Sequence, residues 1–235
     1  MGLVFLDDFE SPDFPDPRRS DQTGLVAVSK ELGPNRLLKA YQRGIFPWMK
    51  MTDPPYFWCW YSPDPRMVLY PTQFKTSRSL SKVLREDRFE IKINQAFSRV
   101  MQACAETPRS GQKSTWIEKD MRLDYGILHS LGIAHSIEAY LQGRLVGGLY
   151  GLAMGGAFFG ESMFHLEAEA SKACVAKLVE ISKDANFAFI DCQVPNPFLL
   201  SLGAQEVSRE TFLDQLKEAR PDLPSVANWM ELGTK

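Results

Sequence analysis

The chain is poor in the residues from which metal sites and disulfides are built. It has only three histidines and four cysteines in 235 residues. The histidines lack the i, i+4 helical pairing or the cysteine partners of a zinc site, and the cysteines show no paired spacing. No signal peptide precedes them. We therefore expect no metal, no disulfide and reduced thiols, as in a cytoplasmic protein.

The chain also lacks a long apolar run and an excess of one charge. Its 27 basic and 29 acidic residues give a formal net charge of −2, so a nucleic-acid partner would need a local basic patch. The longest uncharged stretch, residues 145–160, contains glycines and is shorter than the ~20 apolar residues of a membrane span. With 44% hydrophobic residues, the chain can bury a large core. We expect a globular protein with no membrane association.

The order of the predicted elements indicates an α+β fold. Residues 1–70, with an irregular start, one helix and an aromatic, proline-rich stretch, read as a small N-terminal domain. Residues 71–235 read as a second domain with a mainly antiparallel sheet, because helices precede a strand meander with a Gln142-Gly143 turn. The predicted helices cover residues 34–44, 77–87, 94–106 (capped by Asn94), 117–132, 169–185, 196–203 and a segment after 208; the predicted strands cover 133–141, 144–152, 157–164 and 187–194.

Polar residues interrupt two of these strands. In the run FAFIDCQVPN, residues 187–196, a strand period of two places Asp191 and Gln193 on one face and Cys192 on the other. Such residues commonly cap a turn or satisfy a backbone group, so a purely structural role stays open. Glu161 stands in the apolar run FFGESMF, where a carboxylate must face a cation or a cleft. We predict a polar centre, with the Cys192 thiol packed on the opposite face.

Two tryptophans lie beside turn or cap residues rather than inside periodic apolar runs. Trp48 in GIFPWM and Trp116 in STWIE could each present a ring face to a cleft, where stacking on a nucleobase contributes ~1–3 kcal/mol, although packing in the core is the more common arrangement. Tyr41 and Tyr125 lie on predicted helices, a position typical of core packing.

A series of ordered motifs resembles one protein family, the leucyl/phenylalanyl-tRNA–protein transferases. The resemblance spans roughly residues 24 to 213. Its pieces are RLLKAYQRGIFPWM, YSPDPRMVLYP, TWI, LHSLGIAHSIE, LVGGLYG, FFGESMF, ASKA, IDCQVPN and SLGA. The fold that it implies is a small N-terminal domain followed by an acetyltransferase-like (GNAT) domain, in agreement with the α+β order.

The resemblance also implies an activity and a set of site residues. Leu or Phe, and to a lesser extent Met, would pass from aminoacyl-tRNA to the N-terminal Arg or Lys of an acceptor protein, marking it for degradation without a cofactor. Trp48 and Trp116 would hold the 3′ adenosine of the tRNA, with Tyr41 and Tyr125 nearby. The reaction centre would hold Asp191 and Gln193, with Glu161 supporting it and Asn196 close by. The pocket for the transferred side chain would contain Leu149, Met163, Val175, Leu178 and Ile190.

The chemistry of this transfer makes modest demands on side chains. A free α-amine has a pKa of ~7.7–8.0, so weak base assistance and good positioning are enough for its attack on the aminoacyl ester. Our hypothesis is that Asp191 and Gln193 hold and help to deprotonate the amine, and that Asp191 and Glu161 favour a cationic N-terminal residue. The tRNA body would be bound by cations around one helix, namely Lys75, Arg78, Lys82, Arg85 and Arg88.

The chain departs from the family pattern at several positions, and two other functions remain open. Departures occur at residues 29–32, Glu118, Asp124, His165 and Phe198. A coenzyme A-dependent N-acetyltransferase would use the same fold, but the strand-to-helix junction has no glycine after residue 160 to form a pyrophosphate cradle. A non-catalytic protein that binds a tRNA end or a peptide is the second alternative.

Overall fold

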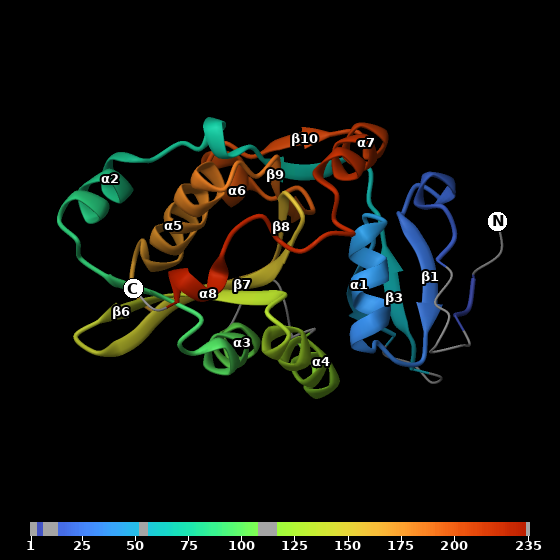
Figure 1. Cartoon of the computed structure of the whole chain (residues 1–235), viewed down its shortest axis with the longest axis horizontal. Helices are drawn as coiled ribbons and strands as arrows, with labels where there is room; N and C mark the ends of the chain where they lie inside the picture. The colour runs from blue at the N-terminus through green and yellow to red at the C-terminus, as the bar shows by residue number, and fades with distance from the viewer. Residues whose placement is uncertain (1–3, 7–13, 52–55, 108–116, 234–235) are drawn as a thin grey trace.

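The computed structural model describes residues 4–6, 14–51, 56–107 and 117–233. Its N-terminal part forms a three-stranded antiparallel sheet in the order β1-β3-β2, covered by helix α1 (Figure 1). The elements are β1 (Leu25–Ser29), α1 (Pro34–Gln42), β2 (Phe46–Lys50) and β3 (Trp58–Tyr61). Helix α1 begins with a proline and ends before a glycine in the left-handed region, Gly44, as the sequence predicts.

The larger part is built on a seven-stranded sheet in the order β10-β4-β9-β8-β7-β6-β5. Every neighbouring pair is antiparallel except β8 and β9, which run parallel. The strands are β4 (Arg66–Leu69), β5 (Glu90–Ile93), β6 (Ala134–Leu141), β7 (Arg144–Met154), β8 (Ala157–His165), β9 (Phe189–Gln193) and β10 (Gln205–Val207). The predicted α+β class with a mainly antiparallel sheet is confirmed.

Helices cover both faces of this sheet (Figure 1). A first hydrophobic cluster joins one face to α1, α3, α4 and α7, and a second cluster joins the other face to α2, α5 and α8. The helices are α2 (Arg78–Arg85), α3 (Phe97–Glu106), α4 (Lys119–Ser130), α5 (Ala170–Asp184), α6 (Pro197–Ser201), α7 (Arg209–Ala219) and α8 (Trp229–Leu232), with short 3-10 helices η1 (Pro17–Arg19) and η2 (Pro71–Gln73). Among the described residues, no helix is both long and apolar enough to cross a lipid bilayer.

The predicted domain division at residue 70 remains a prediction. Strand β4 precedes that residue and nevertheless pairs with β9 and β10 in the larger sheet. The predicted cap of α3 is wrong. Asn94 has a positive φ of 60°, and its side chain bonds the backbone N–H of Ser136 and the ring of His135, so α3 begins later, at Phe97.

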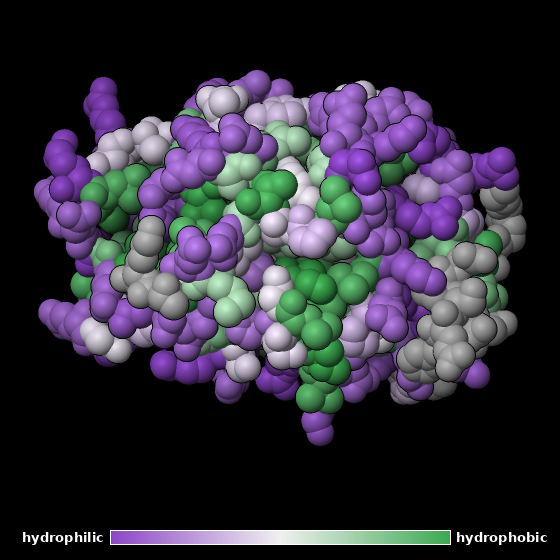
Figure 2. Space-filling view, in the orientation of Figure 1, coloured by the Kyte–Doolittle hydropathy of each residue, from purple (hydrophilic) through white to green (hydrophobic). Residues whose placement is uncertain are grey.

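The outer surface is mostly hydrophilic, with one apolar area over α4 (Figure 2). There Leu123, Ile127 and Leu131 are exposed, whereas Tyr125 on the same helix is completely buried. Because residues on opposite faces of a helix cannot share a neighbour, α4 directs Tyr125 toward the sheet and keeps its apolar outer face in solvent.

Candidate functional site

The polar centre forms beyond the last paired residues of the parallel strands. The register between β8 and β9 runs from Ala157 opposite Phe189 to Phe159 opposite Asp191. Two residues further along each strand, the Gln193 side chain donates Nε2–H to Glu161 Oε1 at 2.8 Å. The two polar side chains that the sequence singles out are therefore in direct contact at the carboxyl end of the pair.

A β-bulge aims Glu161 at this centre. In the β7–β8 register, Tyr150 lies opposite Ser162 and Gly151 lies opposite Gly160, which leaves Glu161 as an extra residue. Glu161 contacts the tyrosines of the first cluster, whereas Met163, two residues later, packs against the second cluster. Without the extra residue, strand alternation would place both side chains on the same face.

Two buried tyrosines complete the centre. Tyr41 of α1 donates to Glu161 Oε1 at 2.6 Å, Tyr125 of α4 donates to Oε2 at 3.0 Å, and the two hydroxyl oxygens lie 2.6 Å apart. Both tyrosines are fully buried, so they are not the ordinary core packing that their helical positions suggested. Tyr41, Tyr125, Glu161 and Gln193 are called the tyrosine–glutamate cluster below.

Burial controls the ionisation of this cluster. Loss of hydration raises the pKa of Glu161 to about 7, although the hydrogen bonds from Tyr41, Tyr125 and Gln193 act in the opposite direction. Burial, followed by the nearby Glu161 charge, raises the pKa of each tyrosine well above its ordinary value. The tyrosines therefore stay protonated as donors, while Glu161 changes charge near neutral pH.

Asp191 is bound by an arginine that the sequence reasoning missed. Arg66 of β4 donates Nε–H and Nη2–H to the two Asp191 carboxylate oxygens at 2.8 and 2.6 Å, and both side chains are fully buried. Its third nitrogen donates to the Gly44 carbonyl at 3.0 Å, and the guanidinium lies between the rings of Phe46 and Phe212. A signal existed, because a lone cation at the start of the apolar run RMVLY requires a buried partner.

This ion pair changes the expected role of Asp191. Its carboxylate is enclosed and already bonded to Arg66, so a ligand cannot touch it together with Gln193, as strand alternation suggested. Asp191 Oδ1 also accepts the Gln193 backbone N–H at 2.9 Å, and Gln193 has a φ of 65°, in the left-handed region. Asp191 thus holds Gln193 in a conformation that a regular strand would not adopt.

The remaining predicted residues lie around this centre. Cys192 packs against the second cluster, opposite the tyrosines, and burial raises the pKa of its thiol. Trp48 is partly buried at a bulge of β2, edge-on to Tyr61 at 5.2 Å between ring centroids. Asn196 is exposed and caps α6 through Phe198 N–H, away from the hydrogen-bonded cluster. Trp116 lies outside the described residues.

The apolar residues predicted to form a pocket gather on the other face of the sheet. Ile190 immediately precedes Asp191 on β9, so strand alternation directs it away from Arg66 and toward α5. The group belongs to the second cluster, where four members are buried and Met163 is half-buried; they are Leu149, Met163, Val175, Leu178 and Ile190.

Comparison with known proteins identifies the family. The family model described as leucyl/phenylalanyl-tRNA protein transferase matches residues 68–217, and the model of that family's N-terminal domain matches residues 30–64. The chain belongs to the leucyl/phenylalanyl-tRNA–protein transferase family. The resemblance drawn from the ordered motifs is therefore confirmed.

Individual relatives cover nearly the whole chain. A leucyl/phenylalanyl-tRNA–protein transferase of Dechloromonas aromatica (strain RCB) is 50% identical over 84% of this chain and 83% of its own length. That of Myxococcus xanthus (strain DK1622) is 43% identical over 98% and 97%. Among solved structures, a GCN5-related N-acetyltransferase-like protein from Streptococcus suis 89/1591 covers 77% of this chain and 68% of its own, with 13% identity and a TM-score of 0.36, a likeness too distant to carry an argument.

In this transferase-family chain, the start of α5 opposes a bound pyrophosphate. Glu169 is the N-cap residue of α5, with a φ of 69°, and its carboxylate pairs with Lys172 at 3.0 Å. Because a helix N-terminus binds anions through its free N–H groups and positive dipole end, a carboxylate there competes with any phosphate. The position therefore gives no support to the coenzyme A-dependent alternative.

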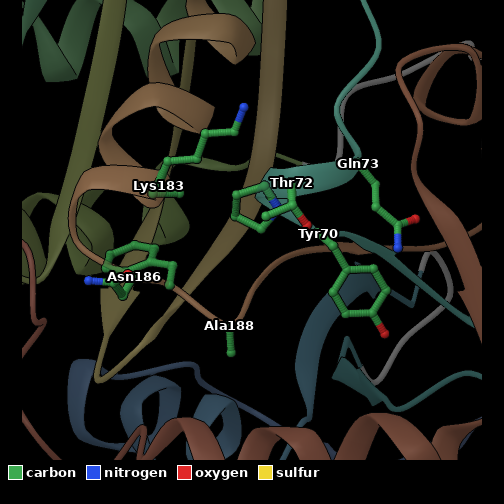
Figure 3. Close-up of a pocket in the computed structure, with 9 residues that line it drawn as sticks. Tyr70, Thr72, Gln73, Lys183, Asn186 and Ala188 are labelled. Carbon is green, nitrogen blue, oxygen red and sulfur yellow. The ribbon is translucent and has the colours of Figure 1, made fainter.

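A surface pocket of about 420 Å³ lies away from the tyrosine–glutamate cluster (Figure 3). It sits between η2 and the turn that joins α5 to β9, so it adjoins the beginning of β9, whereas Gln193 stands at its end. Its lining includes Tyr70, Thr72, Gln73, Lys183, Asn186 and Ala188. None of these is a predicted site residue of the transferase family.

Proposed function

We propose that this chain transfers Leu or Phe, and less readily Met, from aminoacyl-tRNA to the N-terminal Arg or Lys of acceptor proteins in the cytoplasm, marking them for degradation. The observation that carries the proposal is the buried tyrosine–glutamate cluster at the end of β8 and β9, in a chain of this family. No metal or cofactor is required, because the aminoacyl ester is already activated.

The cluster suits the attack of an amine on an ester. The reaction forms a C–N bond, breaks the ester C–O bond and moves one amine proton to the departing 3′ oxygen of the tRNA. Gln193 donates its amide N–H to Glu161, which fixes the amide plane and leaves its carbonyl oxygen to accept from the amine. Glu161, with a pKa of about 7, can take up a proton near neutral pH, and Tyr41 and Tyr125 can return one.

The carboxylates divide their roles in this proposal. Arg66 balances the charge of Asp191, so Asp191 acts by holding Gln193 rather than by touching the amine. Glu161 is left as the carboxylate that favours a cationic acceptor, because its charge has no cationic partner among its printed contacts with Tyr41, Tyr125 and Gln193 in the described structure. Asn196 would act at the edge, beside the capped start of α6.

The substrate side chain and the tRNA end would bind next to the cluster. The apolar set around Ile190 offers Leu and Phe a hydrophobic environment, and such pockets discriminate weakly between side chains that differ by a methylene. Stacking of the 3′ adenosine on Trp48 and Trp116 would position the ester, as aromatic rings do for single-stranded nucleic acids.

Cations around α2 are the proposed contact with the tRNA body. Lys75, Arg78, Lys82, Arg85 and Arg88 are all exposed, and Arg88 also pairs with Glu167 at 3.1 Å. We expect the Lys82→Ala, Arg85→Ala double variant to bind Leu-tRNA more weakly and to show a shallower dependence of log affinity on log salt, by about one unit of slope per lost phosphate contact. Lys217→Ala, at an exposed site on α7, is the control; an unchanged slope in the double variant would reject the patch.

The deciding experiment measures transfer of labelled leucine from Leu-tRNA to a peptide that begins with Arg and to one that begins with Ala. We expect product with the Arg peptide and little with the Ala peptide. Absence of transfer to both would favour the binding-only alternative. Calorimetry with acetyl-coenzyme A should show no binding, and binding would revive the acetyltransferase alternative.

A further inference from the structure

Acidic residues on one side of α4 bind the N-terminal part of the chain. Glu118, directly before α4, pairs with Lys50 of β2 at 3.0 Å, and Asp120 lies 3.9 Å from the same ammonium group. Lys50 also lies over the ring of Trp58, with its nitrogen 5.3 Å from the ring centroid. Its side chain is 22% exposed, against 43% for Glu118, so the pair sits at the junction of the two parts rather than in open solvent.

A second contact joins α4 to the start of α1. Asp124 Oδ2 accepts the backbone N–H of Gly33 at 2.9 Å. Gly33 is the N-cap residue of α1 and has no side chain of its own to cap the helix. Asp124 therefore does, from another helix, what a glutamate in the first turn does in a capping box, and its charge complements the positive end of α1. Burial raises the pKa of Asp124, and the Gly33 hydrogen bond lowers it.

The elements joined by these contacts carry the proposed substrate residues. Strand β2 carries Trp48 two residues before Lys50, helix α1 carries Tyr41, and α4 carries Tyr125 immediately after Asp124. We infer that Glu118 and Asp124 are positioning residues, which form an interdomain clasp that sets the distances between Trp48, Tyr41 and Tyr125. The inference rests on the proposed function, because only that proposal places these aromatic residues at the substrate.

Both clasp residues occupy positions at which this chain departs from the family pattern. Glu118 and Asp124 stand beside Trp116 and Tyr125, where a change of charge could affect substrate fit in two ways. An acidic residue near a tRNA site repels the phosphate backbone, so its removal would tighten binding. A clasp residue holds the site in shape, so its removal would weaken binding. The two explanations predict opposite signs.

The first test is Glu118→Gln, with binding of a non-hydrolysable 3′-amide analogue of Leu-tRNA as the readout. We expect binding about twofold to fivefold weaker than that of the unmodified chain, the range of an exposed ion pair. Exchanging the charges, with Lys50→Glu and Glu118→Lys in one chain, should recover most of this loss. Glu180→Gln, which breaks an exposed pair with Lys177 on α5, is the matched control. Equal or tighter binding by Glu118→Gln would overturn the clasp.

The second test compares Asp124→Asn with Asp124→Ala. The Asn carbonyl can still accept the Gly33 N–H, so we expect kcat/KM for transfer within about twofold of the unmodified chain, whereas Asp124→Ala should lose about fivefold, the effect of a missing cap. Equal activity in the two variants would contradict the role given to this hydrogen bond.

A third readout does not depend on the proposed activity. Amide hydrogen exchange should become faster in the first turn of α1 in Asp124→Ala, and at the end of β2 in Glu118→Gln, while Asp124→Asn and Glu180→Gln stay close to the unmodified chain. If the unmodified chain transfers no leucine, the proposed function fails while the exchange data still test the clasp. If it transfers leucine and these variants change neither exchange nor binding, only the clasp fails.

Discussion

Replacing Arg66 with Met is expected to lower the free energy of unfolding by ~3–5 kcal/mol and to abolish most transfer activity. The substitution leaves the Asp191 carboxylate fully buried between Phe46 and Phe212 without a cation. Asp191 would then take up a proton or draw in water, and either change disturbs its hydrogen bond to the Gln193 backbone. Denaturant unfolding and a single-turnover transfer assay measure the two effects.

Two further variants separate stability from positioning. The double variant Arg66→Met, Asp191→Leu removes both charges, so it should recover much of the stability, as replacement of buried ion pairs by apolar residues often does. It should remain inactive, because the Gln193 N–H has lost its acceptor. Arg66→Lys keeps the charge but cannot form the two parallel bonds, and an intermediate activity is expected. Full activity in the double variant would show that the pair serves stability alone.

Much of the fold can be predicted from local sequence signals. The Gln142-Gly143 turn forms as expected, with φ values of 51° and 75°, because the flanking strands alternate and the turn residues tolerate positive φ. Helices α2 and α7 begin at their serine caps, Ser77 and Ser208. The short strands β5 and β10 are not predicted, because their pairing partners lie far away in the sequence and supply most of the reason for their conformation.

The site is predictable in composition but not in geometry. A carboxylate in an apolar strand and polar residues at a strand end point to Glu161, Asp191 and Gln193. Their actual directions depend on an extra residue in β8, on the positive φ of Gln193 and on the partner that Arg66 gives to Asp191. Each of these is fixed by tertiary contacts, so a strand period of two predicts the face of the side chains and not what they touch.

The last prediction concerns Glu161 and its dependence on pH. Its pKa of about 7 in the folded chain exceeds the model value of 4.5, so between these values the unfolded chain binds fewer protons than the folded one. The contribution of Glu161 is therefore most favourable below pH 4.5, is lost as the pH rises through about 7, and differs by about 3 kcal/mol between these limits. Glu161→Gln removes this titration, so its stability relative to the unmodified chain should increase from pH 5 to pH 8.

Activity should change in the opposite direction. If Glu161 takes up the amine proton, Glu161→Gln should lower the rate of transfer by about 10²–10⁴-fold, the usual contribution of a general base. The pH profile of the unmodified chain should show a limb near the Glu161 pKa of about 7, and the variant should keep only the limb of the amine itself, at ~7.7–8.0. Cys192→Ala, on the opposite face of the sheet, is the control, with an unchanged profile expected. A variant profile identical to that of the unmodified chain would show that the proton leaves by a route that does not include Glu161, since its three hydrogen-bond donors would then serve only to hold Gln193 in place.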